Sequence, residues 1–197
     1  MKTIRTARIE PLNENDPRSR DPLLEDLVSF AGYRPNAVLT MARKPGVVPA
    51  LLNLFGVTLR GDGLLTEQFR FLIAAEAARS AQCRYTTTHL VHIAQHLGVS
   101  WEKLNALPSY LDDPQYTDAE RKALAIASAG GTLPMREPDL AMKQAKLTFS
   151  DDEIIEIVSC VAMAGWFNRW NGLMGSTLES VPSEAMAHVH WLSELEI

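Results

Sequence analysis

The chain has 197 residues, a length typical of one domain that can bury a substantial core. Its 46% hydrophobic and 7% aromatic content indicates a globular protein built on aliphatic residues and excludes a disordered chain. A net charge of -5 with no dense basic run argues against a nucleic-acid-binding protein.

The predicted elements are helices throughout. Residues 1–21, which mix prolines with charges of both signs, are predicted to form an extended arm ahead of a single domain, 22–197. No segment shows the period-2 alternation of a strand, so the predicted fold is all-α, a single-domain multi-helix bundle. In chain order the helices are expected at 22–31, 36–43, 47–60, 66–79, 83–98, 101–107, 117–131, 138–146 and 150–173, with a final helix from Pro182.

Several of these helices begin with recognisable caps. Thr66 and Ser100 are expected N-caps, because a hydroxyl at that position accepts from the N–H groups of the first turn. Capping boxes are predicted at 117–120 and 150–153, and the second opens the most apolar helix of the chain. Asn168 and Asn171 in that helix need partners if buried, so we expect them to pin it to the Cys83 region or to another subunit.

No feature predicts a membrane or secreted protein. The first five residues are not followed by an apolar stretch, so no secretory signal is expected. The longest apolar run, 157–167, is too short to cross a bilayer. Cys83 and Cys160 are far apart and do not form a disulfide framework. We therefore expect a cytoplasmic protein without membrane or nucleic-acid partners.

The segment around Cys83 is the strongest candidate for a functional site. It brings one of the two cysteines close to His89 and His92, and thiols beside imidazoles serve as nucleophiles or redox groups. A cysteine at a helix start would have its thiolate favoured by the unpaired N–H groups there. The alternative is a small, buried, inert core cysteine.

A carboxylate lies on the helix that leads into this segment. Glu76 continues the apolar stripe of Phe69, Leu72 and Ile73, where an unpaired charge would be costly or would take up a proton. Glu76 is therefore either a proton relay with a raised pKa, facing a polar cavity, or the partner of an arginine such as Arg79.

Residues 76–100 resemble the signature of the carboxymuconolactone decarboxylase and alkylhydroperoxidase D superfamily. The resemblance is carried by Ala78-Arg79-Ser80-Ala81-Gln82-Cys83-Arg84-Tyr85, by His89 and His92, and by Gly98-Val99-Ser100. It implies a helical fold with homo-oligomeric assembly, often as trimers or hexamers, with a dimer also possible. Peroxidase members carry Cys-x-x-Cys followed by a histidine, and here Cys83 takes the first cysteine position.

The chain departs from that motif at two positions. Thr86 stands where the second cysteine belongs, and Phe71 occupies the usual position of the relay glutamate, so Glu76 is the nearest acidic substitute. Family members carry the histidine four or, in some cases, three residues after the second cysteine position. His89 lies three residues after Thr86 and fits the shorter spacing. Because threonine cannot close a disulfide, an oxidised Cys83 would have to be reduced by an external thiol.

The helix predicted over 83–98 carries three histidines. His89, His92 and His96 share one face, and in a regular helix His89 points about 120° away from Cys83. An imidazole face can ligate zinc, but no cysteine or acid at ligand spacing completes a set, so no metal or other cofactor is predicted. His89 is the acid/base candidate, and Tyr85, Thr86 and His92 are expected to support the site.

Three functions remain open. The first is a hydroperoxide-reducing enzyme of the peroxiredoxin type, with Cys83 as the reacting residue, Glu76 and His89 as proton relay, and an external thiol as reductant. The second is a decarboxylase or lactone-processing enzyme with a histidine acid/base, as the resemblance also implies. The third is a non-catalytic oligomer that binds a small ligand.

Overall fold

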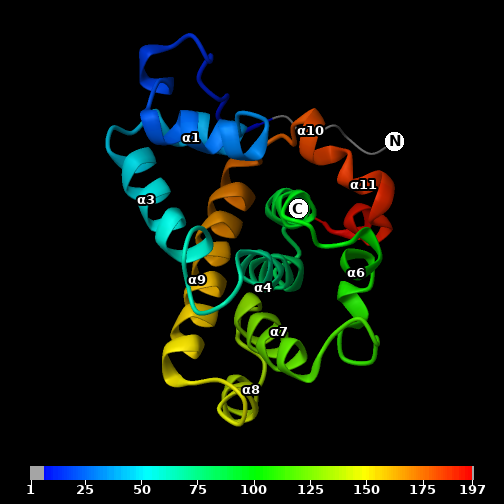
Figure 1. Ribbon diagram of the computed structural model, residues 1–197. Helices are drawn as coiled ribbons and strands as arrows, with labels where there is room; N and C mark the ends of the chain where they lie inside the picture. The colour runs from blue at the N-terminus through cyan, green and yellow to red at the C-terminus, as the bar shows by residue number, and fades with distance from the viewer. Residues whose placement is uncertain (1–6, 197) are drawn as a thin grey trace.

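The computed structural model describes residues 7–196, and the regular elements within that range are all helical, which confirms the predicted fold class. Figure 1 shows the helices that surround a central one. They are α1 (Pro22–Ala31), α2 (Asn36–Met41), α3 (Val47–Leu59), α4 (Glu67–Ser80), α5 (Arg84–His96), α6 (Trp101–Asn105), α7 (Asp118–Gly131), α8 (Pro138–Ala145), α9 (Asp151–Met174), α10 (Ser180–Ser183) and α11 (Ala185–His188), with 3-10 turns η1 (Pro17–Ser19), η2 (Leu107–Ser109) and η3 (His190–Glu194).

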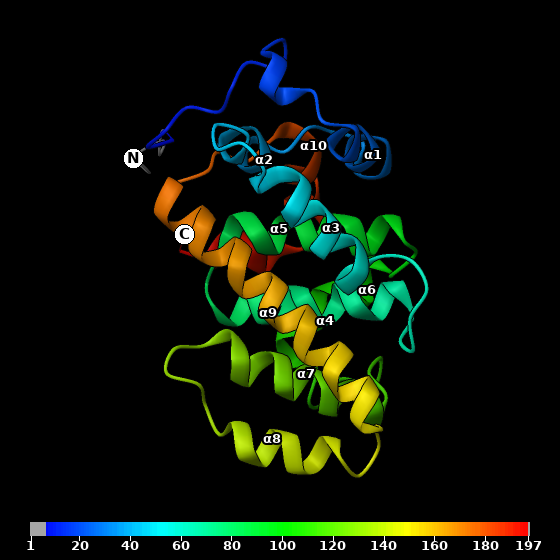
Figure 2. The same cartoon turned by 90° about the vertical axis from the view of Figure 1, so that its left-hand side faces the viewer.

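Helix α4 is the centre of the molecule. Every residue from Arg70 to Ala78 is buried, which is the pattern of a helix enclosed on all sides. It packs against α5, α7 and α9, and Figure 2 shows α4 and α5 stacked in layers with α9 crossing them diagonally. The alanines of α4 make this possible, because small side chains let neighbouring helices approach closely.

A glycine lies at the contact between α7 and α4. A Cβ added to Gly131, the last residue of α7, would lie 2.3 Å from the carbonyl oxygen of Ala77 in α4. No side chain can be placed at that distance from a backbone atom. Gly131 therefore sets how closely α7 can approach α4.

The helix starts follow the sequence signals closely. Thr66 and Ser100 accept from backbone N–H groups as N-caps, and both predicted capping boxes form at α7 and α9. The prediction of one helix after Pro182 was wrong, because that stretch forms the short pieces α10, α11 and η3. These pieces pack on α5, and Val189 between them is extended and fully buried. Tertiary packing here outweighs local helix preference.

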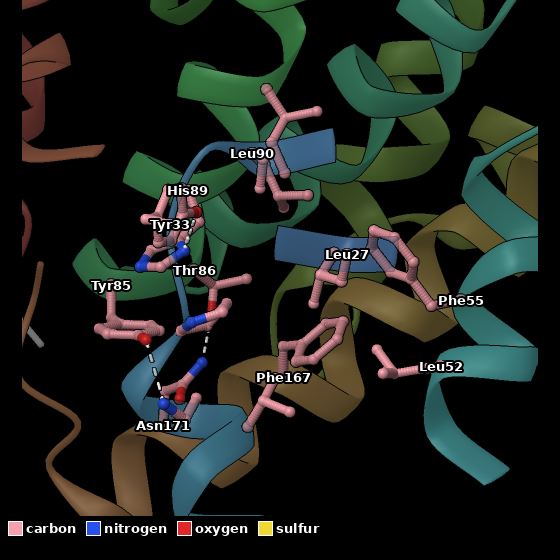
Figure 3. A pocket seen from close by; sticks show the side chains of 15 residues that line it. Leu27, Tyr33, Leu52, Phe55, Tyr85, Thr86, His89, Leu90, Phe167 and Asn171 are labelled. Carbon is pink, nitrogen blue, oxygen red and sulfur yellow. Dashed lines mark hydrogen bonds between the residues drawn. The ribbon is translucent and has the colours of Figure 1, made fainter. Parts of the chain in front are cut away.

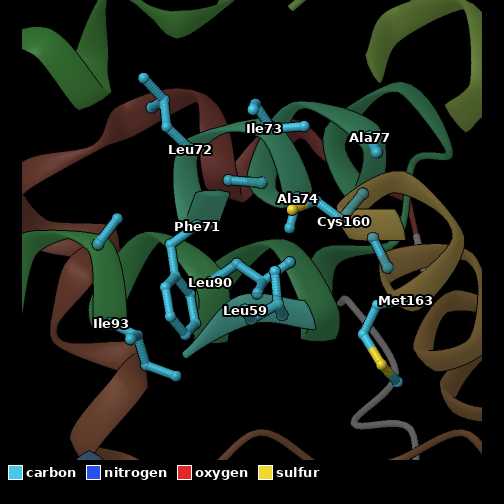
Figure 4. Packing of buried hydrophobic residues seen from close by; sticks show 14 of the residues in the cluster. Leu59, Phe71, Leu72, Ile73, Ala74, Ala77, Leu90, Ile93, Cys160 and Met163 are labelled. Atoms are coloured by element: carbon cyan, nitrogen blue, oxygen red, sulfur yellow. The ribbon is translucent and has the colours of Figure 1, made fainter. Parts of the chain in front are cut away.

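The core continues from α4 into α5 and α9. Phe71 of α4 lies beside Leu90 and Ile93 of α5, as Figure 4 shows. Cys160 lies in the same core, fully buried, and burial raises the pKa of its thiol to about 12. It is a packing residue and stays protonated at neutral pH.

The described part of the N-terminal arm, residues 7–21, packs against the helical domain of the same chain. Arg8 donates to the carbonyl oxygens of Gly172 and Leu173 at 2.7 and 2.6 Å, where α9 ends, and Leu12 is buried. A cation at the carbonyl end of a helix is favourable. Residues 1–6 of the predicted arm lie outside the described range, and the domain boundary at 21 stays a prediction.

Across residues 7–196, even the 24-residue α9 lacks the continuous apolar length that crossing a bilayer requires.

Candidate functional site

A small cavity of about 60 Å³ lies where α1, α2, α3, α5 and α9 converge, and Figure 3 shows it from close by. Its walls are almost entirely apolar, and its polar groups gather on the side formed by α5. The lining residues are Leu27, Ala31, Tyr33, Pro35, Ala37, Val38, Leu52, Phe55, Tyr85, Thr86, His89, Leu90, Ile93, Phe167 and Asn171. A volume of this size holds a few waters or part of a small ligand.

His89 is the polar centre of the cavity. The hydroxyl of Tyr33 lies 2.6 Å from His89 Nδ1, and Glu179 Oε2 lies 2.8 Å from His89 Nε2, an ion-pair contact that is not a linear hydrogen bond. The ring of Tyr85 stacks on the imidazole at 4.1 Å between centroids. The imidazole is therefore held on both nitrogens and one face.

Tyr33 is the hydrogen-bond partner of Nδ1 of His89. Burial, together with the nearby charge of Glu179, raises the pKa of the Tyr33 hydroxyl, so the hydroxyl keeps its proton. On a neutral imidazole that hydroxyl donates to Nδ1, which leaves the ring proton on Nε2, the nitrogen that faces the carboxylate.

Glu179 was not identified from the sequence. Burial tends to raise the pKa of its carboxyl, but hydrogen bonds and charge from His89, with the Asn36 N–H and the Tyr85 hydroxyl, lower it overall. Tyr85 donates to Oε1 at 2.7 Å, and the backbone N–H of Asn36 donates to the same oxygen. Glu179 stays ionised at neutral pH, and no spacing in the sequence relates it to His89.

Cys83 is the N-cap of α5, one turn before the cavity begins. Its Sγ lies 3.2 Å from Thr86 Oγ1, and Thr86 in turn accepts from Asn171 Nδ2 at 3.0 Å. Thr86 and Asn171 line the cavity, whereas Cys83 itself is 3% exposed and lies behind them. The Asn171 contact confirms that α9 is pinned to the Cys83 region.

The thiol of Cys83 is protonated in this state. Burial raises its pKa, although the Thr86 hydroxyl and the N–H groups of Thr86 and Tyr85 lower it in part. The helix start thus favours the thiolate as expected, but the lack of solvent outweighs that effect. Any reaction at Cys83 requires the thiol to lose its proton as the substrate binds.

Glu76 lies in a different polar cluster. It pairs with Arg79 through two contacts of 2.6 and 2.7 Å and accepts from Ser80 at 3.0 Å, facing Ser128 of α7. Burial raises the pKa of Glu76 despite these partners. Of the two roles considered, the structure shows the arginine pair, and it does not bring Glu76 to the cavity with His89.

The remaining predicted residues are divided between the two sides of α5. Tyr85 and Thr86 line the cavity, whereas His92 is half-buried outside it, with Nε2 3.4 Å from the carbonyl oxygen of Ala31. Burial lowers the pKa of His92, so it stays neutral. Among residues 7–196 no group of acids, histidines and cysteines is arranged to hold a metal ion. The catalytic roles of Cys83 and His89 stay predictions, as does the absence of a cofactor.

The family comparison matches the segment that the sequence singled out. Residues 45–129 match the carboxymuconolactone decarboxylase family, a range that holds Cys83, Thr86 and His89 but neither Tyr33 nor Glu179. The chain has no significant match among curated proteins.

Solved structures extend the likeness to nearly the whole chain. The debrominase Bmp8, as a variant with one cysteine replaced by alanine in complex with 2,3,4-tribromopyrrole, aligns with a TM-score of 0.85 at 27% identity, over 93% of this chain and 98% of Bmp8. Its apo form gives 0.83 at 28% identity, over 92% and 97%. A peroxidase-related protein with the AhpD core from Ralstonia eutropha JMP134 gives 0.72 at 19% identity, over 88% and 94%, which shows a shared fold.

Proposed function

Because the chain belongs to the carboxymuconolactone decarboxylase and AhpD-like superfamily, we propose that it is a thiol-dependent reductase with a single reacting cysteine, Cys83. The substrate is a small apolar molecule, in the first place an organic hydroperoxide, and the reductant is an external thiol. The observation that carries the proposal is the chain of contacts from Cys83 Sγ through Thr86 to a cavity that His89 also lines.

The reaction balances in two steps. The sulfur of Cys83 attacks the hydroperoxide, so that an S–O bond forms, the O–O bond breaks, and the thiol proton ends on the departing alkoxide as alcohol. Two external thiols then reduce the sulfenic acid, which releases water and one disulfide and restores Cys83. Thr86 imposes the second step, because it leaves Cys83 without an intramolecular thiol partner.

His89 is the group proposed to pass the proton to the leaving oxygen. Its ring lines the cavity with Nε2 facing the ionised carboxylate of Glu179, so a proton carried by the imidazole lies next to the substrate. In this proposal Glu179 has the proton-relay role that the sequence assigned to Glu76. The apolar walls suit the alkyl or aryl part of a hydroperoxide.

A second substrate class rests on the likeness to Bmp8 and on the aromatic rings around the cavity. Bmp8 is a debrominase, and the aromatic side chains of Phe55, Phe167 and Tyr33 line this cavity. A brominated aromatic ring could transfer bromine to Cys83 while the ring carbon takes a proton from His89. Two external thiols then release bromide and a proton and form one disulfide, so the electrons balance.

Decarboxylation receives no support from this cavity. A carboxylated substrate needs a cation, and the lining contains neither lysine nor arginine. Glu179 beside His89 would repel a second carboxylate.

The test is a direct comparison of both substrate classes with excess dithiothreitol. Hydroperoxide loss and bromide release from 2,3,4-tribromopyrrole would be followed for the wild type, Cys83→Ser and Cys160→Ala. We expect turnover of one class that falls at least about 100-fold in Cys83→Ser. Cys160→Ala, which removes the core thiol, should keep it. Turnover that persists in Cys83→Ser rejects the proposal, and binding of either compound without turnover favours the ligand-binding alternative.

A further inference from the structure

The hydroxyl of Thr86 lies between the sulfur of Cys83 and the side-chain amide of Asn171. Its Oγ1 is 3.2 Å from Cys83 Sγ and 3.0 Å from Asn171 Nδ2, and Figure 3 shows Thr86 and Asn171 together at the cavity. An amide nitrogen can only donate, so Thr86 Oγ1 accepts from it. The single hydroxyl proton of Thr86 is then free to point at the sulfur.

A serine on the other side of Asn171 turns the nitrogen of the amide towards Thr86. Ser176 Oγ donates to Asn171 Oδ1 at 2.9 Å, so the oxygen end of the amide faces the serine. With the amide reversed, its oxygen would accept the hydroxyl proton of Thr86, and the sulfur would lose that donor. The direction of donation therefore runs from Ser176 through Asn171 and Thr86 to Cys83.

The turn that ends α9 places this serine. Gly175 has a φ of 62°, in the left-handed region that favours glycine, and its N–H donates to the carbonyl oxygen of Asn171 at 2.9 Å. The chain folds back at this point, which brings Ser176 onto the side chain of Asn171. Asn36 of α2 holds the next residue, since its Nδ2 donates to the carbonyl oxygen of Thr177 at 3.0 Å. The fold thus fixes the serine on both sides.

This line of donors suits an ionised sulfur. A thiolate can only accept, and a threonine hydroxyl can donate to it while it accepts from an amide. The backbone N–H groups of Tyr85 and Thr86, at the start of α5, act on the same sulfur. Thr86 and Asn171 are each 3% exposed, so water competes little with these contacts, and hydrogen bonds to a charged group are strong in such surroundings.

From this arrangement we propose that Asn171 and Ser176 are positioning residues, which direct the hydroxyl proton of Thr86 at Cys83 Sγ and thereby stabilise the thiolate. Both roles rest on the proposed function, in which Cys83 is the reacting residue. Neither side chain touches the sulfur, since both act through Thr86. A threonine at this position thus has a role that cysteine would fill less well, because a thiol is a weak donor.

The test is the titration of Cys83 itself, followed by NMR of its isotope-labelled Cβ in the full chain. All variants carry Cys160→Ala, so that a single cysteine gives the signal, and no reagent has to reach the buried sulfur. We expect the titration midpoint to rise by about one pH unit in Thr86→Val, which removes a hydrogen bond to a charged group. Asn171→Leu and Ser176→Ala should each raise it by about half a unit, because they loosen that hydrogen bond without removing it.

Two further threonine variants are the matched controls. Thr86→Ser keeps the hydroxyl and should restore the wild-type midpoint. Thr88→Val alters a buried threonine of the same helix whose Oγ1 has no hydrogen-bond partner in the described chain, so it should leave the midpoint unchanged. Circular dichroism verifies that each variant is folded.

A double variant separates action through Thr86 from a general effect on the fold. Ser176→Ala should shift the midpoint in the wild-type background and have no further effect in the Thr86→Val background. An equal shift in both backgrounds would overturn the proposal. Midpoints that coincide in the wild type and Thr86→Val, or a sulfur that stays protonated in both until the chain unfolds, would also overturn it. The expected shifts in a protein that turns over neither substrate class would support these positioning roles and reject the proposed function, so the two fail separately.

Discussion

His89 Nε2 on α5 lies 2.8 Å from Glu179 Oε2, so the imidazole of the motif helix is paired with a carboxylate from the last part of the chain. The motif segment alone supplies a cysteine and a histidine but no acid near them. Glu179, from the C-terminal segment, supplies the acid. The proposed reaction therefore depends on a contact that a local motif cannot contain.

Replacing Glu179 by glutamine should reduce turnover. Glu179→Gln keeps the shape of the side chain but removes the negative charge that faces Nε2 of His89, so we expect a fall in kcat of about 10- to 100-fold. The measurement is steady-state kinetics with the substrate class that the wild type turns over. Glu194→Gln, at an exposed carboxylate of η3, is the control and should leave kcat unchanged. Equal loss in both variants would contradict a specific role for Glu179.

The carboxylate of Glu179 should make the free energy of unfolding depend on pH in the acid range. The pKa of Glu179 is lower in the folded chain than its ordinary 4.5, so its ionised form stabilises the fold above that value. As the pH falls below about 4.5 and through the folded pKa, this contribution disappears. Urea unfolding of wild type and Glu179→Gln between pH 7 and pH 3 measures it. The free-energy gap between the two should narrow at the acid end, and a constant gap would show that the charge is not responsible.

Thr86→Cys should restore an internal disulfide. Because Cys83 Sγ and Thr86 Oγ1 are 3.2 Å apart, a sulfur at the threonine position needs only a small shift to bond with Cys83. After treatment with one equivalent of hydroperoxide we expect two thiols fewer by thiol titration and a mass loss of two hydrogens. Thr88→Cys, at a buried threonine of the same helix, is the control and should keep its thiol free. Free thiols that persist in Thr86→Cys would disprove the predicted proximity.

Two glycine substitutions should move stability in opposite directions. Gly131→Ala places a Cβ 2.3 Å from the Ala77 carbonyl oxygen, so we expect a loss of about 1–3 kcal/mol in the free energy of unfolding. Gly56→Ala in α3 meets nothing within 4 Å and should add about 0.5–1 kcal/mol, since alanine favours a helix. Urea denaturation of both variants checks the pair. A stable Gly131→Ala would mean that α4 and α7 can separate without cost.

The sequence was most informative where the determinants are local. Thr66, Ser100 and the two capping boxes begin helices as predicted, because an N-cap acts within four residues. The final helix was not predictable in this way. The chain after Pro182 follows the surface of α5, and the resulting short turns are determined by contacts with residues far away in the sequence.

The residues of the site also divide into those that local sequence identifies and those that only the fold brings together. Cys83, Thr86 and His89 are close in sequence and were identified together, although the burial that raises the pKa of the thiol was not. Glu76 was chosen as the acid because it was the nearest carboxylate along the chain. In space Arg79 binds it, and the carboxylate that reaches His89 comes from a loop with no motif of its own.

The position of Glu179 also has a consequence for biosynthesis. Cys83 and His89, which supply the thiol and the imidazole, are synthesised well before Glu179, which follows α9 in the chain. Until that loop docks between α2 and α5, the nascent protein holds its sulfur and its imidazole without the carboxylate that pairs with them. The imidazole and its carboxylate partner therefore come together only after α9 has been synthesised.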